Sequence, residues 1–197
     1  MKTKRSGKIN GGVIRWLLLI NVFLTFIVTT SYGQKIAVKT NLLYDATTTL
    51  NLGVEVGLGK RWTADISGNY NPWKFGKYRL KHWLVQPEIR YWFCESFNGH
   101  FLGVHGHYAE YNVGGLFFNS HMRHNRYQGH LYGGGISYGY QWILNNRWNL
   151  EATIGVGYAR LKDDQYPCAS CGEKIRTESR NYWGPTKAGI TIVYIIK

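Results

Sequence analysis

The sequence is poor in methionine, proline, cysteine and acidic residues. Two Met, four Pro and three Cys occur among 197 residues, and 11 Asp and Glu stand against 24 Lys and Arg. Because three is an odd number, a scaffold in which every cysteine is paired within the chain is excluded. Long apolar runs are confined to one stretch near the N-terminus, and no stretch after residue 34 has a helical period. These deficits favour a β-protein over a helical one.

Glycine and aromatic residues, in contrast, are abundant, with 24 Gly, 15 Tyr and 8 Trp. The mean hydropathy of -0.30 is that of a soluble chain, but an average conceals alternation. Eight segments alternate apolar with polar or small residues, which is the period of a β-strand with two different faces. These predicted strands are residues 36–44, 50–58, 62–70, 83–91, 101–111, 130–142, 148–158 and 187–197.

The N-terminal apolar run has the layout of a signal peptide. Five Lys and Arg precede residues 16–28, and the small residues Ser31 and Gly33 follow, with no cysteine of a lipoprotein after them. The run is short for a membrane-spanning helix, so we expect residues 1–33 to be removed and residues 34–197 to form the domain. An uncleaved anchor is the alternative. Removal lowers the formal net charge of +13 by five, to +8, and export argues against a nucleic-acid partner.

The eight predicted strands are joined alternately by short turns and by longer connections. An even strand number with this asymmetry is typical of a bacterial outer-membrane barrel. One face of each strand carries aliphatic and aromatic residues, with Tyr and Trp near the strand ends, while the other face is polar or charged. A water-soluble barrel would have the opposite distribution. We therefore predict an all-β fold, an eight-stranded antiparallel transmembrane β-barrel of the outer-membrane type in the bacterial outer membrane. A large β-sandwich is the alternative.

The polar face of the predicted barrel points into its lumen and carries charges of both signs. Charges confined in so narrow an interior need partners, because an unpaired buried charge is costly. We therefore expect an ion-paired network that fills the lumen and leaves no wide pore. Its predicted members are Lys39, Glu55, Asp65, Glu88, Arg90, Glu151 and Lys187.

The last predicted strand has two further properties. A barrel in a membrane has no open edge, so residues 187–197 should pair with residues 36–44. The strand also resembles the C-terminal signal that the barrel insertion machinery reads. The residues of that predicted assembly signal are Lys187, Gly189, Ile192 and Tyr194.

The cysteines leave several kinds of site open. Cys168 and Cys171 form a CxxC motif, which can be a small disulfide, a redox pair or half of a zinc site. His121 and His124 in the preceding long connection could complete a Cys2His2 zinc site if the two segments converge. Cys94 is predicted in a short turn at the opposite end as a free thiol. We predict no other cofactor.

The long connections are rich in Lys and Arg. Loops 113–128 and 161–182 could therefore bind lipopolysaccharide phosphates, a glycan or a fimbrial partner, although a solvated rim beside outer-membrane lipid is the simpler interpretation. A barrel enzyme would need a base paired with a nucleophile. No serine or aspartate is spaced to suggest such a pair with a histidine, so we predict a non-enzymatic protein with a structural or surface-interaction role and no catalytic residues.

Four segments of the sequence, "KTNLLYDA", "LNLGVEVGL", "PEIRYW" and "YWGPTKAGITIVYIIK", resemble an uncharacterised family of small outer-membrane β-barrels from Bacteroidetes. The family is a domain of unknown function whose members often lie near fimbrial genes. The resemblance covers roughly residues 34–197, and "GPTKAG" is its most specific part. It implies the same fold and location, and it supplies no activity.

Overall fold

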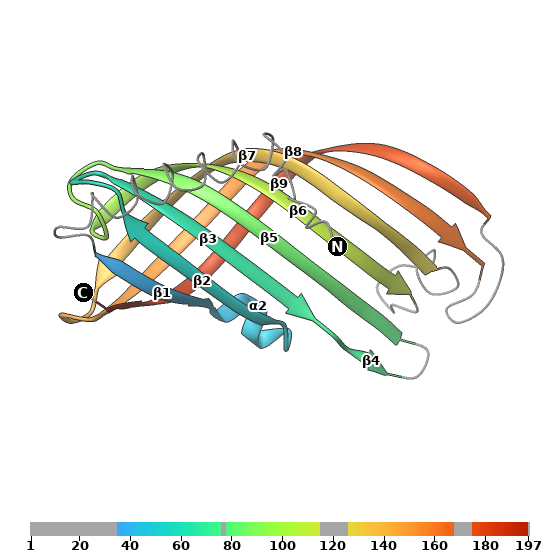
Figure 1. Ribbon diagram of the computed structural model, residues 1–197, viewed down its shortest axis with the longest axis horizontal. Helices are drawn as coiled ribbons and strands as arrows, with labels where there is room; N and C mark the ends of the chain where they lie inside the picture. The colour runs from blue at the N-terminus through green and yellow to red at the C-terminus, as the bar shows by residue number, and fades with distance from the viewer. Residues whose placement is uncertain (1–34, 76–77, 115–125, 168–174, 197) are drawn as a thin grey trace, which may run out of the picture. The chain divides into compact units, whose positions relative to one another are not determined.

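A computed structural model of the protein describes residues 35–75, 78–114, 126–167 and 175–196, which lie in one compact unit, Lys35–Lys197. These residues form nine strands and one short helix (Figure 1). The elements are β1 (Ile36–Asn41), α2 (Leu42–Ala46), β2 (Leu50–Gly57), β3 (Trp62–Asn71), β4 (Lys74–Phe75), β5 (Tyr78–Trp92), β6 (Gly99–Gly114), β7 (Arg126–Ile143), β8 (Trp148–Tyr166) and β9 (Arg176–Ile195). Within the described part of the chain, no helix is long and apolar enough to cross a membrane.

Eight of the strands form one antiparallel sheet that closes into a ring. Each strand pairs with its neighbours in the order β1-β2-β3-β5-β6-β7-β8-β9, and β9 returns to β1. The closing pairs include Val38 opposite Tyr194 and Thr40 opposite Ile192. The two-residue strand β4 follows β3 in the chain and pairs with the first residues of β5. The predicted pairing of the first and last strands is therefore confirmed.

The two faces of the ring have opposite chemistry. On the inner face, Glu55 is 0 % exposed and Arg90 is 1 % exposed. On the outer face, Leu52 is 60 % exposed and Val104 is 66 % exposed. Successive side chains of a strand point to opposite faces, so the alternation in the sequence translates directly into a polar interior and an apolar exterior.

The first predicted strand is too long by three residues. β1 ends at Asn41, and Leu42–Ala46 form the helix α2. The Asn41 side chain accepts a hydrogen bond from the Leu43 backbone N–H and thereby caps the helix. The alternation predicts that Tyr44, at the end of the first predicted strand, lies on the apolar face with the other aromatic residues near strand ends; this expectation is wrong, because Tyr44 lines an interior cavity.

The long connections predicted as loops are partly strand. β6 continues to Gly114 and β7 begins at Arg126, which shortens the predicted loop 113–128. β8 continues to Tyr166 and β9 begins at Arg176, so most of the predicted loop 161–182 belongs to these two strands. Figure 1 shows β5 to β9 running past α2 as an extension of the sheet. Alternation is weak in these polar segments, which is why the sequence pattern missed them.

β9 contains a bulge, and the residues of β9 that face inward have odd numbers on one side of it and even numbers on the other. Gly155 lies opposite Lys187 and Val156 lies opposite Pro185, so Thr186 is an extra residue. The Thr186 hydroxyl lies 2.9 Å from His105 Nε2, and its carbonyl accepts a bond from the Gln86 side chain. Thr186 and Lys187 therefore both point inward.

Candidate functional site

Arg90 lies at the centre of an ionic cluster inside the ring. Its Nη1 atom is 3.0 Å from Glu55 Oε2 and 2.9 Å from Glu151 Oε2. Its Nε atom is 2.6 Å from Glu88 Oε2, and its Nη2 atom is 3.4 Å from Asp65 Oδ2. One guanidinium thus contacts carboxylates from four strands, which its planar fork of five N–H donors permits.

Two lysines complete the cluster from the strands that close the ring. Lys39 on β1 contacts Glu55 and lies 2.9 Å from Glu151 and 3.6 Å from Asp65. Lys187 on β9 lies 2.7 Å from Glu88 and 3.9 Å from Asp65. The structure therefore brings all seven residues of the predicted lumen network together, and three cations meet four carboxyl groups.

Hydroxyl groups bind three of the four carboxylates. Thr63 donates to Glu55 at 2.5 Å, Thr153 donates to Glu151 at 2.9 Å, and Ser137 donates to Glu88. A Cβ at Gly103 would overlap both the Glu88 carboxylate and the Ser137 hydroxyl. Because buried charges are tolerated when they are paired and hydrogen-bonded, this arrangement is that of a stable, filled interior.

Three aromatic rings close the interior at the end of the short turns. Trp92, Phe97 and Phe101 are buried, and the Trp92 ring centroid lies 4.7 Å from Phe101 and 6.0 Å from Phe97. Arg90 stacks on Phe101 at 4.5 Å and so joins the rings to the ionic cluster. Phe97 has a positive φ of 69°, which is uncommon outside glycine, and its turn places the ring inside the sheet.

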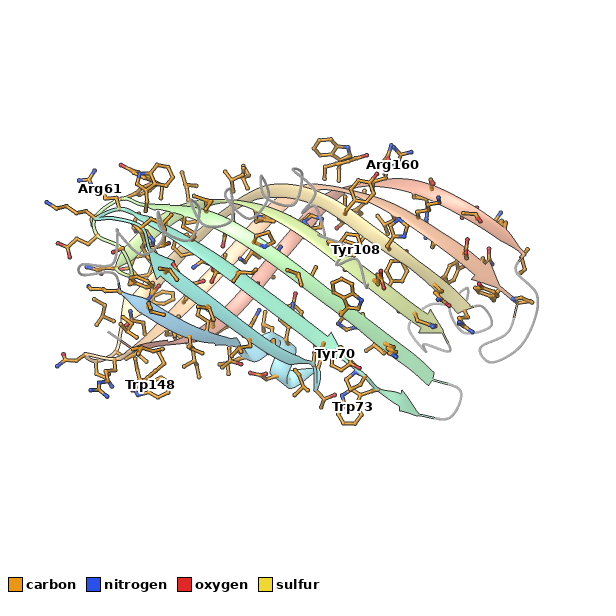
Figure 2. All side chains as sticks on the ribbon, in the orientation of Figure 1. Arg61, Tyr70, Trp73, Tyr108, Trp148 and Arg160 are labelled. Atoms are coloured by element: carbon orange, nitrogen blue, oxygen red, sulfur yellow. The ribbon has the colours of Figure 1, made fainter. Side chains whose placement is uncertain are left out.

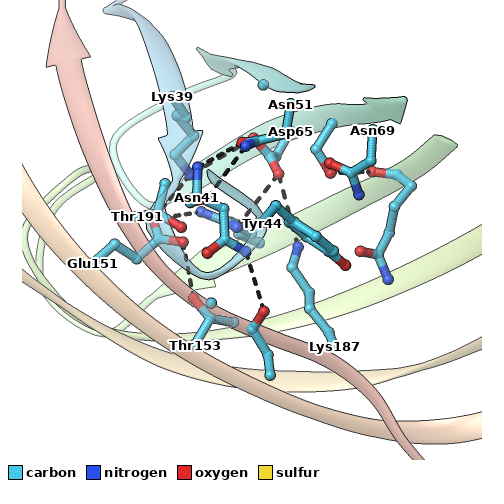
Figure 3. Close-up of a pocket in the computed structure, with 16 residues that line it drawn as sticks. Lys39, Asn41, Tyr44, Asn51, Asp65, Asn69, Glu151, Thr153, Lys187 and Thr191 are labelled. Carbon is cyan, nitrogen blue, oxygen red and sulfur yellow. Dashed lines mark hydrogen bonds and ion pairs between the residues drawn. The ribbon is translucent and has the colours of Figure 1, made fainter. Parts of the chain in front are cut away.

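A small cavity of about 40 Å³ lies on the other side of the cluster (Figure 3). Lys39, Asp65, Glu151 and Lys187 line one side, and Tyr44 from α2 lines another. A volume of this size holds about one water molecule and no larger ligand. The interior is therefore filled by its own side chains.

The polar groups of the cluster are engaged by one another. Ser137 donates to a carboxylate and does not contact a histidine, and both Glu88 and Glu151 are engaged by cations. Across the described residues, no group of three or more His, Cys, Asp or Glu could hold a metal ion. The ion pairs neutralise the buried charges and join the strands that carry them.

The predicted cysteine and histidine sites have different outcomes. Cys94 is exposed and unpaired in the turn between β5 and β6. Cys168, Cys171, His121 and His124 lie outside the described residues, so their disulfide or zinc alternatives stay predictions.

The residues of the predicted assembly signal are divided between the two faces. Lys187 and Gly189 point inward, toward Glu88 and Asn41 respectively. Tyr194 lies on the outer face, where its ring packs against Trp148, tilted, with the ring centroids 4.8 Å apart, and its hydroxyl accepts a bond from Arg147. Ile192 lies on the same face beside Thr40 and Leu150.

Aromatic side chains on the outer face gather toward two levels of the sheet. Figure 2 shows Trp148 near the short turns, and Tyr70, Trp73 and Tyr108 farther along the strands. The aliphatic exposed residues Leu52, Ile66, Val104, Ile136, Ile154 and Val156 lie on the strand stretches between them. The apolar band, as we call this surface with its aromatic margins, ends before the strands do.

Several important interior residues escaped the sequence analysis. Trp92 follows the inward parity of Glu88 and Arg90, and this alternation could have identified it. Phe97 lies in a turn, where no period exists, and Thr186 faces inward only because of the bulge. Turn and bulge positions cannot be assigned to a face by counting residues.

Comparison with known proteins gives one match. No curated protein and no solved structure matches the chain. A family described as "Protein of unknown function (DUF3575)" matches residues 18–196. Because this match covers most of the sequence, the chain, with its ring-closed eight-stranded antiparallel sheet, belongs to the DUF3575 family.

Proposed function

We propose that this chain is a non-enzymatic β-barrel of the bacterial outer membrane, exported by a cleaved signal peptide, with a structural or surface-interaction role. The observation that carries the proposal is the inverted arrangement of the ring, with an ionic cluster inside and an apolar band outside. In hydrocarbon every backbone polar group must be bonded within the protein, and a closed ring of strands meets this demand. Aromatic residues at both margins of the band are typical of such barrels.

The filled interior supports a closed barrel. Arg90 and its four carboxylates occupy the middle, and the three buried rings occupy one end. An eight-stranded barrel has only enough room for its side chains. In planar bilayers the purified protein should give no sustained conductance steps, and reproducible open-channel steps from the wild-type protein would contradict a closed barrel.

Heat-modifiable migration tests the barrel itself. An unboiled sample extracted from membranes should migrate differently from a boiled one, because a closed barrel resists unfolding by detergent. Fractionation of the native cells should place the protein in the outer membrane. Identical migration of the two samples, or recovery in the soluble fraction, would overturn the proposal.

The sheet extension favours a second role, in which the protein binds a fimbrial, glycan or lipopolysaccharide partner. β8 has 19 residues and β9 has 20, whereas a tilted strand needs about 9–11 to cross a membrane. The residues of β5 to β9 that are not needed to cross the membrane would project beyond the lipid.

Shortening the hairpin of β8 and β9 separates the two roles. Lys162 lies opposite Ser179, so residues 163–178 can be replaced by an Asn-Gly turn without changing the register below. A binding module should lose adhesion and partner pull-down while keeping its heat-modifiable migration, whereas a purely structural barrel should lose neither. Replacing residues 145–147 of the short turn by Asn-Gly, which keeps Leu144 opposite Trp148, is the control.

A further inference from the structure

A groove of about 440 Å³ lies on the outer face of β3, β5, β6 and β7, at the margin of the apolar band. Tyr70, Trp83, Glu110 and His130 form one row across these four strands, each directly opposite the next. Figure 2 shows Tyr70 and Tyr108 at this level of the sheet. A volume in the range of roughly 300–1,000 Å³ suits a small ligand.

The aromatic rings of Trp83 and His130 line the first part of the groove, and the ring of Tyr108 lies beside them. The Trp83 and Tyr108 ring centroids are 5.4 Å apart, and the Tyr108 and His130 rings lie 6.3 Å apart with an angle of only 15° between their planes. Trp83 is 36 % exposed, so part of its face is free to contact a ligand. Flat rings that are held in place offer contact area at little cost in conformational entropy.

A carboxylate fixed by these rings forms the second part. Trp83 Nε1 donates to Glu110 Oε2 at 3.2 Å, and the Tyr108 hydroxyl donates to Glu110 Oε1 at 3.1 Å. A carboxylate has about four lone-pair sites, so Glu110 can still accept hydrogen bonds from a ligand. The two bonds orient it beside the exposed rings.

The remaining lining residues define the charge of the groove. Among the described lining residues Lys81 is a cation and Glu110 and Asp164 are anions, and the Arg126 guanidinium lies beside them, with its Nε atom 2.9 Å from Asn112 Oδ1. The groove therefore has no excess of positive charge, and its two carboxylates oppose a phosphate, which needs a cluster of cations. Asn112 and Gln128 add amide N–H donors, since their carbonyl oxygens accept hydrogen bonds from Arg126. This mixture matches hydroxyl groups.

We propose that this groove binds a neutral or amino sugar. The ring faces of Trp83 and its neighbours contact the apolar face of the sugar, while Glu110 and the amides of Asn112 and Gln128 bond its hydroxyl groups. The sugar belongs either to a glycolipid, whose chains would lie on the apolar band, or to a free saccharide. Only the glycolipid source rests on the proposed membrane-spanning function.

Saturation-transfer NMR tests the site on the full chain in lauryldimethylamine oxide, a detergent without a sugar. The probes are maltose and diacetylchitobiose as free saccharides, and dodecyl maltoside as a sugar on a chain. We expect saturation of the sugar-ring protons in the wild type and at least a fivefold loss in Trp83→Ala. Glu110→Gln, which keeps the shape of the side chain, should lose about as much if the fixed carboxylate is needed.

Trp62→Ala is the matched control, because the Trp62 ring packs against Tyr91, 5.0 Å between centroids, on the same outer face but near the other end of the strands. Transfer to the free saccharides that depends on Trp83 supports the site with a saccharide ligand, and transfer to dodecyl maltoside alone, with the same dependence, supports a glycolipid. Absence of transfer to all three probes, or equal loss in the Trp62 and Trp83 variants, overturns the site. Heat-modifiable migration of each variant reports the barrel separately, so failure of one proposal is distinguishable from failure of the other.

Discussion

Arg90 and Glu88, which lie two residues apart on the inner face of β5, form a direct ion pair of 2.6 Å. The pair is local, but each member also contacts distant strands, since Arg90 reaches Glu55 and Glu151 and Glu88 receives Lys187. The strand β5 is thus connected to strands on both sides of the ring through the charges of Glu88 and Arg90.

Removal of the central cation should destabilise the fold strongly. Arg90→Met leaves four buried carboxyl groups with two lysines, and breaking a buried pair in this way costs about 3–5 kcal/mol. We expect a lower urea midpoint for unfolding in detergent and reduced heat-modifiable migration. Arg61→Met, at an exposed residue in a short turn, is the control. Equal midpoints for the two variants would show that the cluster does not stabilise the ring.

The closing strand should be needed for assembly. Tyr194 lies on the outer face opposite Val38 and packs against Trp148. A carboxylate at this position, in Tyr194→Asp, would face lipid in the proposed arrangement, and loss of residues 187–197 would remove the ring closure. Both changes should abolish the folded form in the outer-membrane fraction. Ser179→Asp, at an exposed position of the same strand opposite Lys162, should leave it unchanged; wild-type levels of the Tyr194 variant would contradict the prediction.

Asn41 should contribute to stability at the point where β1 ends. Its side chain caps α2, accepts a bond from the Ile190 N–H and donates to the Ala188 carbonyl. Loss of a helix cap alone costs about 0.5–2 kcal/mol, and Asn41→Ala also removes the bonds to β9. We expect a measurable decrease in the free energy of unfolding for Asn41→Ala and a smaller one for Asn41→Asp, which retains the acceptors. Equal losses would assign the effect to the lost donor alone.

Tyr111 should titrate abnormally on the sheet extension, beyond the apolar band. Burial and the nearby Asp163 carboxylate raise the pKa of Tyr111 to about 12, from an ordinary value of 10. Because the folded state favours the neutral phenol, the stabilisation is complete below pH 10 and is lost as the pH rises toward 12. A difference titration of wild type and Tyr111→Phe by tyrosinate absorbance should isolate one phenol with this pKa. A difference curve centred at pH 10 would contradict the placement.

The local alternation of residues was sufficient to predict most of the fold. Along β2, Leu52, Val54 and Val56 alternate with Gly53 and Glu55, and the structure divides them between the two faces as expected. The same reasoning identified the charged residues that face inward, because every second residue of a strand points to the same face. Where the backbone leaves the period, at Asn41 and Thr186, prediction from parity failed. A helix cap and a bulge depend on neighbouring strands that the sequence does not display.

The sequence by itself determined that this chain has strands with one polar and one apolar face, since a period of two is a property of the strand backbone. Only the tertiary structure decided which charges meet. Arg90 contacts Glu55 from 35 residues away and Glu151 from 61 residues away, and Lys39 contacts Glu151 across 112 residues. Ring closure and register set these distances, because the inner side chains of every strand converge on one narrow axis only after β9 has paired with β1.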